Sequence, residues 1–200
     1  MKLKDYKMIF FAVALTGVLL IAAFSYSNLY RPSSSDPFSQ LSLLDAAHAA
    51  KNFPFNLQVG NSYSAYVGVT NHMGNSMYYV LYVKLANKMD QLPNPETATT
   101  SPLEPLYEYR FTLQDGKNWE NLMKFSVKSA SISGNQSSIQ TLSINDDSIT
   151  VNKASVWDSN ATIYYYKLFF ELWAYNSQST AITYNNRCVY LLLNITQTSG

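Results

Sequence analysis

The stretch that decides the fold covers residues 63–86 and reads YSAYVGVTNHMGNSMYYVLYVKLA. Residues 63–70 alternate Tyr, Ala and Val with small or polar residues, which is the pattern of a strand with one buried face. Residues 71–75, Asn-His-Met-Gly-Asn, have the composition of a turn, and residues 76–86 form a second long run of Tyr, Val and Leu. The stretch therefore predicts two strands of an all-β domain, and we interpret the turn between them as a hairpin.

The same alternation continues toward the C-terminus. Residues 87–105 carry four prolines and a Thr/Ser cluster, so this segment is expected to be an extended loop and not a central strand. The Asp-Gly pair at 115–116 is a hairpin signal between strands expected at 107–113 and 119–127. Other strands are expected at 38–44, 139–144, 148–151, 162–175 and 187–196.

Seven or eight strands without an amphipathic helix predict an antiparallel two-sheet sandwich of the immunoglobulin or fibronectin type, over residues 38–197. We expect six large apolar residues to contribute to its core: Trp119, Phe125, Leu168, Phe170, Val189 and Leu191.

The composition limits the classes of partner. Charged residues make up 14% of the chain and Tyr alone supplies 16 residues, so neutral polar groups must cover much of the surface. Four of the 14 basic residues and one of the 13 acidic residues lie at or before Arg31, which leaves the rest of the chain with a net charge of −2. Because no basic patch dominates, nucleic acid is not an expected partner. Cys188 is the single cysteine, so no internal disulfide is possible, and we expect a small buried side chain there.

The N-terminal region predicts a membrane anchor. Residues 8–24 contain no charge, and residues 8–26 are expected to form a single transmembrane helix that binds the lipid bilayer. Lysines lie in residues 1–7, so the positive-inside rule places this segment in the cytoplasm and the domain outside the cell. Residues 27–37, rich in Ser and Pro, are expected to be a linker. The alternative is a cleaved signal peptide, for which Ala23-Phe24-Ser25 offers suitably spaced small residues.

The order of motifs resembles the mostly archaeal family named domain of unknown function 1616. The resembling features are Phe53-Pro54, Gly60, Val67-Gly68-Val69, Asn71-His72 and a later Asp115-Gly116 turn into a Trp-containing strand. The resemblance covers residues 38–195 and implies a membrane-associated protein with an exported β-domain. Met73 stands where an acidic residue is expected, and one anchor replaces the several helices of larger members. The family implies no activity.

Candidate chemistry is sparse. The chain has two histidines, His48 and His72, and lacks a nucleophile elbow or a phosphate-binding glycine loop, so we expect neither a metal site nor a cofactor nor an enzyme. Two alternatives stay open. The first is a calcium site made by Asp146, Asp147 and Asp158, against a solvated turn. The second is a glycosidase carboxylate pair, Glu104 with Glu108 or Glu120 with Glu171, against ordinary exposed strand charges.

Residues 164–175 are strongly aromatic and offer a candidate recognition strip. Strand alternation sends Tyr164, Tyr166, Leu168 and Phe170 to one face, and sends Tyr165, Lys167, Phe169 and Glu171 to the other. One of the two faces is therefore expected to be core. The other face is a candidate surface for a sugar or a protein partner.

Three sequons, at Asn135, Asn160 and Asn194, predict N-glycosylation if the domain is exported. We expect a structural or protein-interaction module of the archaeal cell envelope with an envelope or membrane-protein partner. The alternatives are an accessory subunit of a membrane complex and an extracellular carbohydrate-binding protein or enzyme.

Overall fold

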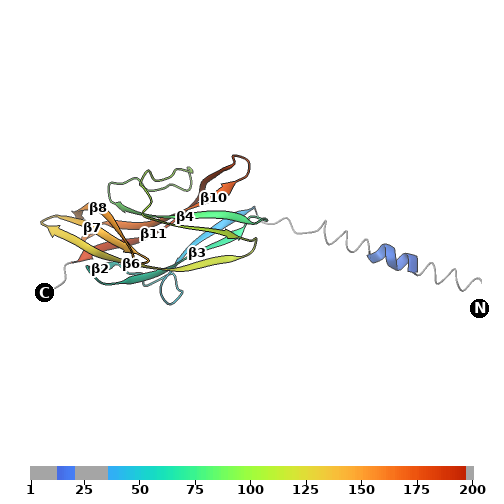
Figure 1. Cartoon of the computed structure of the whole chain (residues 1–200), viewed down its shortest axis with the longest axis horizontal. Helices are drawn as coiled ribbons and strands as arrows, with labels where there is room; N and C mark the ends of the chain where they lie inside the picture. The colour runs from blue at the N-terminus through green and yellow to red at the C-terminus, as the bar shows by residue number, and fades with distance from the viewer. Residues whose placement is uncertain (1–12, 21–35, 197–200) are drawn as a thin grey trace, which may run out of the picture. The chain divides into compact units, whose positions relative to one another are not determined.

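The computed structural model describes residues 13–20 and 36–196, and the chain divides into two units, Met1–Pro37 and Phe38–Gly200. In the first unit, residues 13–20 are helical (Figure 1). No helix within the described residues is long and apolar enough to cross a membrane. The expected cytoplasmic segment 1–7, most of the expected anchor 8–26 and most of the linker 27–37 lie outside the described residues, so these stay predictions.

The second unit consists of eleven strands (Figure 1). Their bounds are β1 Phe38–Leu44, β2 Asn56–Gln58, β3 Tyr63–His72, β4 Met77–Asn87, β5 Tyr107–Leu113, β6 Asn118–Ser133, β7 Gln136–Ile144, β8 Asp147–Asp158, β9 Ile163–Tyr164, β10 Tyr166–Asn176 and β11 Ala181–Thr196. One sheet has the order β1-β3-β6-β7-β8-β9 and the other has the order β2-β11-β10-β4-β5. The prediction of an all-β domain with two sheets is confirmed.

Strand pairing differs from the expectation at one edge. All neighbouring strands run antiparallel except β2 and β11, which are parallel. β2 is too short to be recognised by alternation, since only Leu57 of its three residues is buried. Its position beside β11 follows from that one buried side chain and from Asn194, which donates a hydrogen bond to Asn56.

The two turns interpreted as hairpins are connections between the sheets, and that interpretation was wrong. β3 and β6 lie in the six-stranded sheet, whereas β4 and β5 lie in the five-stranded sheet. The turn at 71–75 therefore carries the chain from one sheet to the other, and the turn at 114–117 carries it back. Turn composition alone does not distinguish these two cases, because both need Gly or Asn where the chain reverses.

Asn71 holds the two turns together. Its side chain is fully buried, and its Nδ2 donates to the carbonyl oxygens of Asn75 and Leu113, each at 2.8 Å. Its backbone carbonyl accepts from Gly116 N–H at 2.7 Å, and its N–H donates to the Lys117 carbonyl at 3.0 Å. Asn71 thus forms hydrogen bonds with backbone groups of both connections, which gives a structural reason for Asn at this position.

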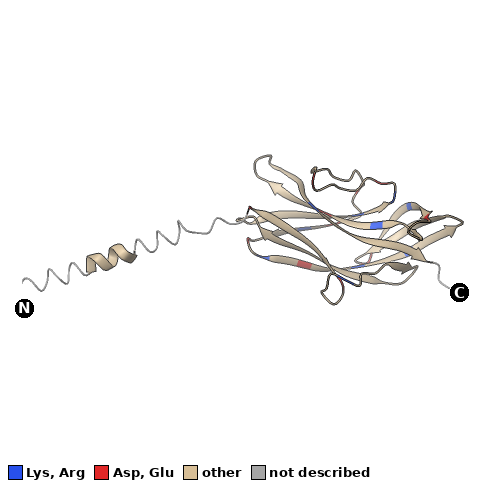
Figure 2. Cartoon of the chain, turned by 180° about the vertical axis from the view of Figure 1, so that it is seen from behind, with Lys and Arg blue, Asp and Glu red and all other residues tan. Residues whose placement is uncertain are grey.

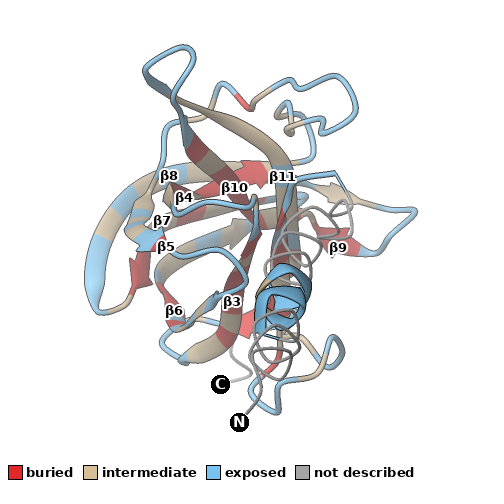
Figure 3. Cartoon of the chain, turned by 90° about the vertical axis from the view of Figure 1, so that its right-hand side faces the viewer, coloured by how far each residue is buried: buried red, intermediate tan, exposed pale blue. Residues whose placement is uncertain are grey.

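A single hydrophobic core lies between the sheets (Figure 3). Of the six residues expected there, Phe125, Leu168, Phe170 and Leu191 are buried in it, and Trp119 and Val189 pack against it partly buried. Each large apolar side chain that is fully buried contributes about 1.5 to 3 kcal/mol.

Two buried tyrosine hydroxyls cross this core between the sheets. Tyr79 on β4 bonds Ser39 on β1 at 2.8 Å, and Tyr166 on β10 bonds Ser137 on β7 at 2.9 Å. Burial raises the pKa of both tyrosines, because the interior disfavours a phenolate. These pairs fix the relative position of the sheets at two separate points.

Charged side chains are sparse over the domain, as Figure 2 shows. Two of them, Lys84 and Glu171, are nevertheless almost fully buried, at 4% and 0% exposed. A buried charge is expensive unless it is paired and hydrogen-bonded. Each of the two charges is therefore expected to have an opposite charge and hydrogen-bond partners close by.

Candidate functional site

The outer face of the five-stranded sheet is partly covered by the segment between β4 and β5. On β4 the neighbours Val83 and Leu85 point into the core, so Lys84 lies on the opposite, outer face. Lys84, Phe169 and Glu171 are buried although they lie on that outer face. The connecting loop, residues 88–106, contributes Ser101 to this burial through direct hydrogen bonds, so the loop lies against the sheet and does not project freely.

Lys84, Glu171 and Ser101 form what we call the loop clamp. Lys84 Nζ lies 2.7 Å from Glu171 Oε2 and donates to the Ser101 carbonyl at 3.1 Å. The Ser101 N–H donates to Glu171 Oε1 at 2.8 Å, and Trp173 Nε1 donates to Oε2 at 3.4 Å. Both backbone groups of one loop residue are thus bonded to a buried ion pair. This arrangement holds the middle of the loop in one position.

Two further sets of contacts order the loop on either side of the clamp. The Asp90 carboxylate accepts from Asn87 N–H at 2.8 Å and from Lys153 Nζ at 2.9 Å, which ties the start of the loop to β8. Asn94 and Thr99 form a two-residue bridge that closes the exposed tip. The loop is therefore ordered by polar contacts along its length.

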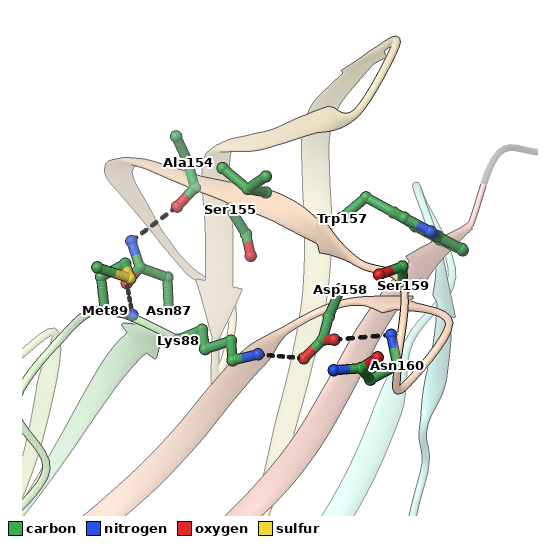
Figure 4. Close-up of a pocket in the computed structure, with 10 residues that line it drawn as sticks. Asn87, Lys88, Met89, Ala154, Ser155, Trp157, Asp158, Ser159 and Asn160 are labelled. Carbon is green, nitrogen blue, oxygen red and sulfur yellow. Dashed lines mark hydrogen bonds and ion pairs between the residues drawn. The ribbon is translucent and has the colours of Figure 1, made fainter.

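A hollow of about 600 Å³ opens where the start of the loop meets β8 (Figure 4). Its wall includes the Lys88–Asp158 ion pair, with Nζ 2.6 Å from Oδ2. The pKa of Asp158 is lowered, mainly by the hydrogen bond from Lys88 and also by the N–H groups of Ala161 and Asn160. Met89 and Val156, which also line the hollow, are 89% and 64% exposed. Exposed apolar side chains beside a charged pair suit contact with another protein better than contact with water.

The single strand expected at 162–175 is wrong, because these residues divide into β9 in the six-stranded sheet and β10 in the five-stranded sheet. The predicted alternation of faces is nevertheless confirmed. Tyr164, Tyr166, Leu168 and Phe170 all belong to the core. On the other face, Lys167 Nζ lies 4.0 Å from the centre of the Tyr190 ring, within the range of a cation–π contact. Tyr190 is 53% exposed, so this face stays open beyond the part that the loop covers.

The two histidines make structural contacts. His48 stacks on Tyr66 with ring centres 4.0 Å apart and lies 3.3 Å from Glu120. His72 packs against Phe38 at 4.7 Å. In the part of the chain that the structure describes, no group of three or more His, Cys, Asp or Glu side chains lies close enough to hold a metal.

The geometry argues against two of the carboxylate hypotheses, the calcium site and the pair Glu120 with Glu171. Asp146 and Asp147 precede or begin β8 and Asp158 ends it, which separates them by roughly 36 Å at about 3.3 Å per residue. The calcium site is therefore wrong. Glu120 lies in the six-stranded sheet, whereas Glu171 lies in the other sheet and is taken up by Lys84. Glu108 pairs with Arg110 at 2.6 Å.

The sequons lie in different surroundings. Asn135 is exposed in the connection between β6 and β7, and Asn160 is exposed beside the hollow (Figure 4). Asn194 is 8% exposed, with its Oδ1 accepting from Tyr164 N–H and its Nδ2 donating to Asn56 Oδ1, both at 2.9 Å. A glycan on Asn194 would have to displace the bond to Asn56.

Sequence reasoning missed the loop clamp. The sequence nevertheless carried a signal for it, in the form of two opposite charges within strongly apolar segments. Lys84 lies in residues 76–86, and Glu171 lies in residues 162–175. Two opposite charges in strands that are otherwise buried are expected to pair, because neither is tolerated alone. The sequence does not indicate that this ion pair also bonds the backbone of Ser101.

Comparison with known proteins gives a family and distant structural likenesses. No curated protein matches the chain. A solved beta-glucosidase from Listeria innocua is 11% identical with a TM-score of 0.39, over 81% of this chain and 16% of that one. The CARDB domain of the PF1109 protein from Pyrococcus furiosus, in complex with di-metal ions, is 10% identical with a TM-score of 0.38, over 84% of this chain and 96% of that one. Spo0M, a sporulation control protein from Bacillus subtilis, is 12% identical with a TM-score of 0.34, over 80% and 49%. Likenesses this distant carry no argument here.

The family model described as a domain of unknown function, DUF1616, matches residues 32–163. This range contains both turns that Asn71 joins and also the loop of the clamp. It ends before β10, so the matched range stops short of the residues 38–195 expected from the resemblance. Because the match covers more than half of the chain, this protein belongs to the DUF1616 family.

Proposed function

We propose that this protein is a membrane-anchored module of an archaeal cell envelope, with a domain that lies outside the cell and binds a protein partner. The proposed contact surface consists of the clamped loop, residues 88–106, and the adjoining hollow between Asn87 and Asn160. The observation that carries the proposal is the loop clamp. A buried ion pair is a costly way to hold a connection, and function is the usual reason for a long ordered loop.

The chemistry of the surface favours a protein as the partner. Met89 and Val156 offer exposed apolar area, while Lys88 and Asp158 offer a charge of each sign between them. An apolar centre with polar groups around it is the usual composition of a protein interface. Because the loop is already ordered, binding would lose little conformational freedom, which favours affinity.

The proposed location depends on the N-terminal sequence. Residues 8–24 carry no charge and are preceded by three lysines, which favours a helix that crosses the bilayer with its N-terminus in the cytoplasm. The domain that follows has no disulfide, so its stability in any compartment depends on the core and on the contacts between the sheets.

We further propose that the domain is a sandwich of the immunoglobulin or fibronectin type. Two sheets that share one core, with consecutive strands passing between them at 71–75 and 114–117, support this assignment. The parallel strand β2 and the length of β6 are departures from the simplest arrangement of that type.

Extraction of native membranes with a mild detergent, followed by mass spectrometry, tests the proposal. The wild-type protein is compared with Met89→Asp combined with Val156→Asp, which places charge on the proposed surface. Leu122→Asp is the matched control, because Leu122 is also an exposed apolar residue, at 36%, but lies on the six-stranded sheet.

We expect a partner that is recovered with the wild type and with the control variant, and that is lost with the double variant. Integral-membrane partners at fixed stoichiometry would assign the protein as an accessory subunit, whereas envelope partners would assign a structural role. If the protein is recovered alone, and instead turns over a glycan or a peptide, the interaction hypothesis is wrong.

A further inference from the structure

A second hollow, of about 730 Å³, lies at the opposite end of β4 from the surface proposed above. Its walls come from residues 73–78, from the end of β10 and from the start of β11. β4 separates Met77 from Asn87 by roughly 33 Å, at about 3.3 Å per residue. We call it the tyrosine groove, after Tyr78, Tyr175 and Tyr184 in its wall.

The tyrosine groove has an unusual composition. None of the described residues that line it is charged. Besides the tyrosines, the wall consists mainly of carboxamide and hydroxyl side chains, including Asn176, Gln178, Asn185 and Asn186. No Lys or Arg lines this wall, and Arg110, which contacts Tyr78, is already paired with Glu108, so an anionic ligand is disfavoured. The absence of Asp, Glu, His and Cys in this wall disfavours a metal.

An irregularity in β11 brings two of these carboxamides into the wall. Leu172 pairs with Arg187 and Trp173 pairs with Tyr184, so Asn185 and Asn186 are additional residues on β11. Asn186 has a φ of 55°, in the left-handed region. Such bulges redirect side chains and are common beside binding sites. Asn tolerates this backbone conformation better than most residues, which suits it to the bulge.

Two side-chain oxygens in this wall have unmet hydrogen-bonding capacity. Within the described residues, Tyr184 Oη and Asn186 Oδ1 are the only buried side-chain polar atoms without a conventional hydrogen bond. Tyr184 does have the Cys188 thiol as a hydrogen-bond partner, although a thiol is a weak one, and burial raises the pKa of Tyr184. A buried polar atom left without a partner costs about 1 to 3 kcal/mol. Both residues belong to the groove wall, which is therefore rich in polar groups, although these two oxygens are themselves covered by protein atoms.

We propose that the tyrosine groove binds a neutral carbohydrate. The C–H face of a pyranose ring packs on a tyrosine ring, and its hydroxyls donate to and accept from carboxamides, so no charge is needed. Tyr175, which is 43% exposed, provides the accessible ring. The volume lies within the range of about 300 to 1,000 Å³ that small-ligand sites occupy. This site is independent of the proposed protein-binding surface.

Calorimetric titration of the full-length protein tests the assignment, in a detergent without a sugar head group. The probes are maltohexaose, cellohexaose and mannohexaose, with hexagalacturonate as the charged control. Tyr175→Ala removes the exposed ring. Asn186→Gly removes the unpaired carboxamide and tolerates the left-handed backbone. Tyr190→Ala is the matched control, because Tyr190 is an exposed tyrosine on the same sheet outside the groove.

We expect at least one neutral hexasaccharide to bind, and both groove variants to weaken that binding about tenfold or more, while Tyr190→Ala leaves it unchanged. Thermal unfolding of each variant verifies that the domain still folds. The proposal is overturned if no neutral probe binds at roughly 10 mM. It is also overturned if Tyr175→Ala and Tyr190→Ala have equal effects, or if hexagalacturonate binds as tightly as the neutral probes.

Discussion

Replacing Lys84 by Met removes the positive member of the loop clamp while keeping most of the side-chain volume. Glu171 then stays fully buried with two N–H donors, from Ser101 and Trp173, but with no opposite charge. The Ser101 carbonyl also loses its donor. The variant should therefore be less stable, and the loop should be released from the sheet.

The size of the effect follows from these losses. Removing one member of a buried ion pair costs about 3 to 5 kcal/mol, because the remaining charge is uncompensated. That is a large part of the roughly 5 to 15 kcal/mol that stabilises a typical domain. For a domain of this length, about 3 to 5 kcal/mol lowers the Tm by roughly 6 to 20 °C.

A double variant separates the charge from the packing. Lys84→Met combined with Glu171→Leu leaves no buried charge, so it should recover much of the lost stability. It should not recover all of it, because the N–H and carbonyl of Ser101 still lack partners, at about 1 to 3 kcal/mol for each group.

Denaturant unfolding measures the free energies, and amide hydrogen exchange at Ser101 measures release of the loop. Exchange at the Ser101 N–H should become faster in both variants, because the single variant removes the bond that holds the Ser101 carbonyl and the double variant also removes the acceptor of the N–H. The reasoning is refuted if Lys84→Met costs less than about 1 kcal/mol, or if the double variant is less stable than the single one.

Three other predictions concern separate parts of the domain. Asn71→Ala removes the side-chain hydrogen bonds to both connections between the sheets. In denaturant titrations it should lower the free energy of unfolding by about 2 to 4 kcal/mol. A loss no larger than that of an exposed Asn→Ala change would contradict this. Burial raises the pKa of Tyr109 to about 12 from an ordinary value of 10.0, so the neutral form is favoured in the folded state and stability should fall as pH rises between these values. Unfolding free energies measured across that range should fall less steeply for Tyr109→Phe, and equal slopes would refute the assignment. Glycopeptide mass spectrometry of the native protein should show glycans at Asn135 and Asn160 and none at Asn194, whereas an unmodified chain by intact mass would reject glycosylation altogether.

The all-β class and most of the core were predictable from the sequence. Alternation identifies which residues of a strand share a face, and Phe125, Leu168 and Phe170 are buried as that rule requires. The rule also separated the two faces of β10 correctly. It depends only on local geometry, which is why a single sequence is sufficient for it.

Connections between strands were not predictable in the same way. Residues 71–75 and 114–117 contain the amino acids that hairpins use, yet each joins strands of different sheets. The choice depends on the core, since β3 and β4 contribute apolar residues to one core from two different sheets. The candidate surfaces depend on such tertiary choices. The loop clamp needs Lys84 and Glu171 on neighbouring strands, and the tyrosine groove needs a bulge in β11.

Photocrosslinking in intact cells tests most directly whether the clamped loop and its hollow form the partner surface. A photoreactive residue replaces Met89, which is 89% exposed beside the hollow, and in a control replaces Lys128, an exposed residue of β6 in the other sheet. We expect one protein to be crosslinked at a fixed ratio from position 89 and not from position 128. Equal crosslinking from the two positions, or none from position 89, would contradict the proposed function.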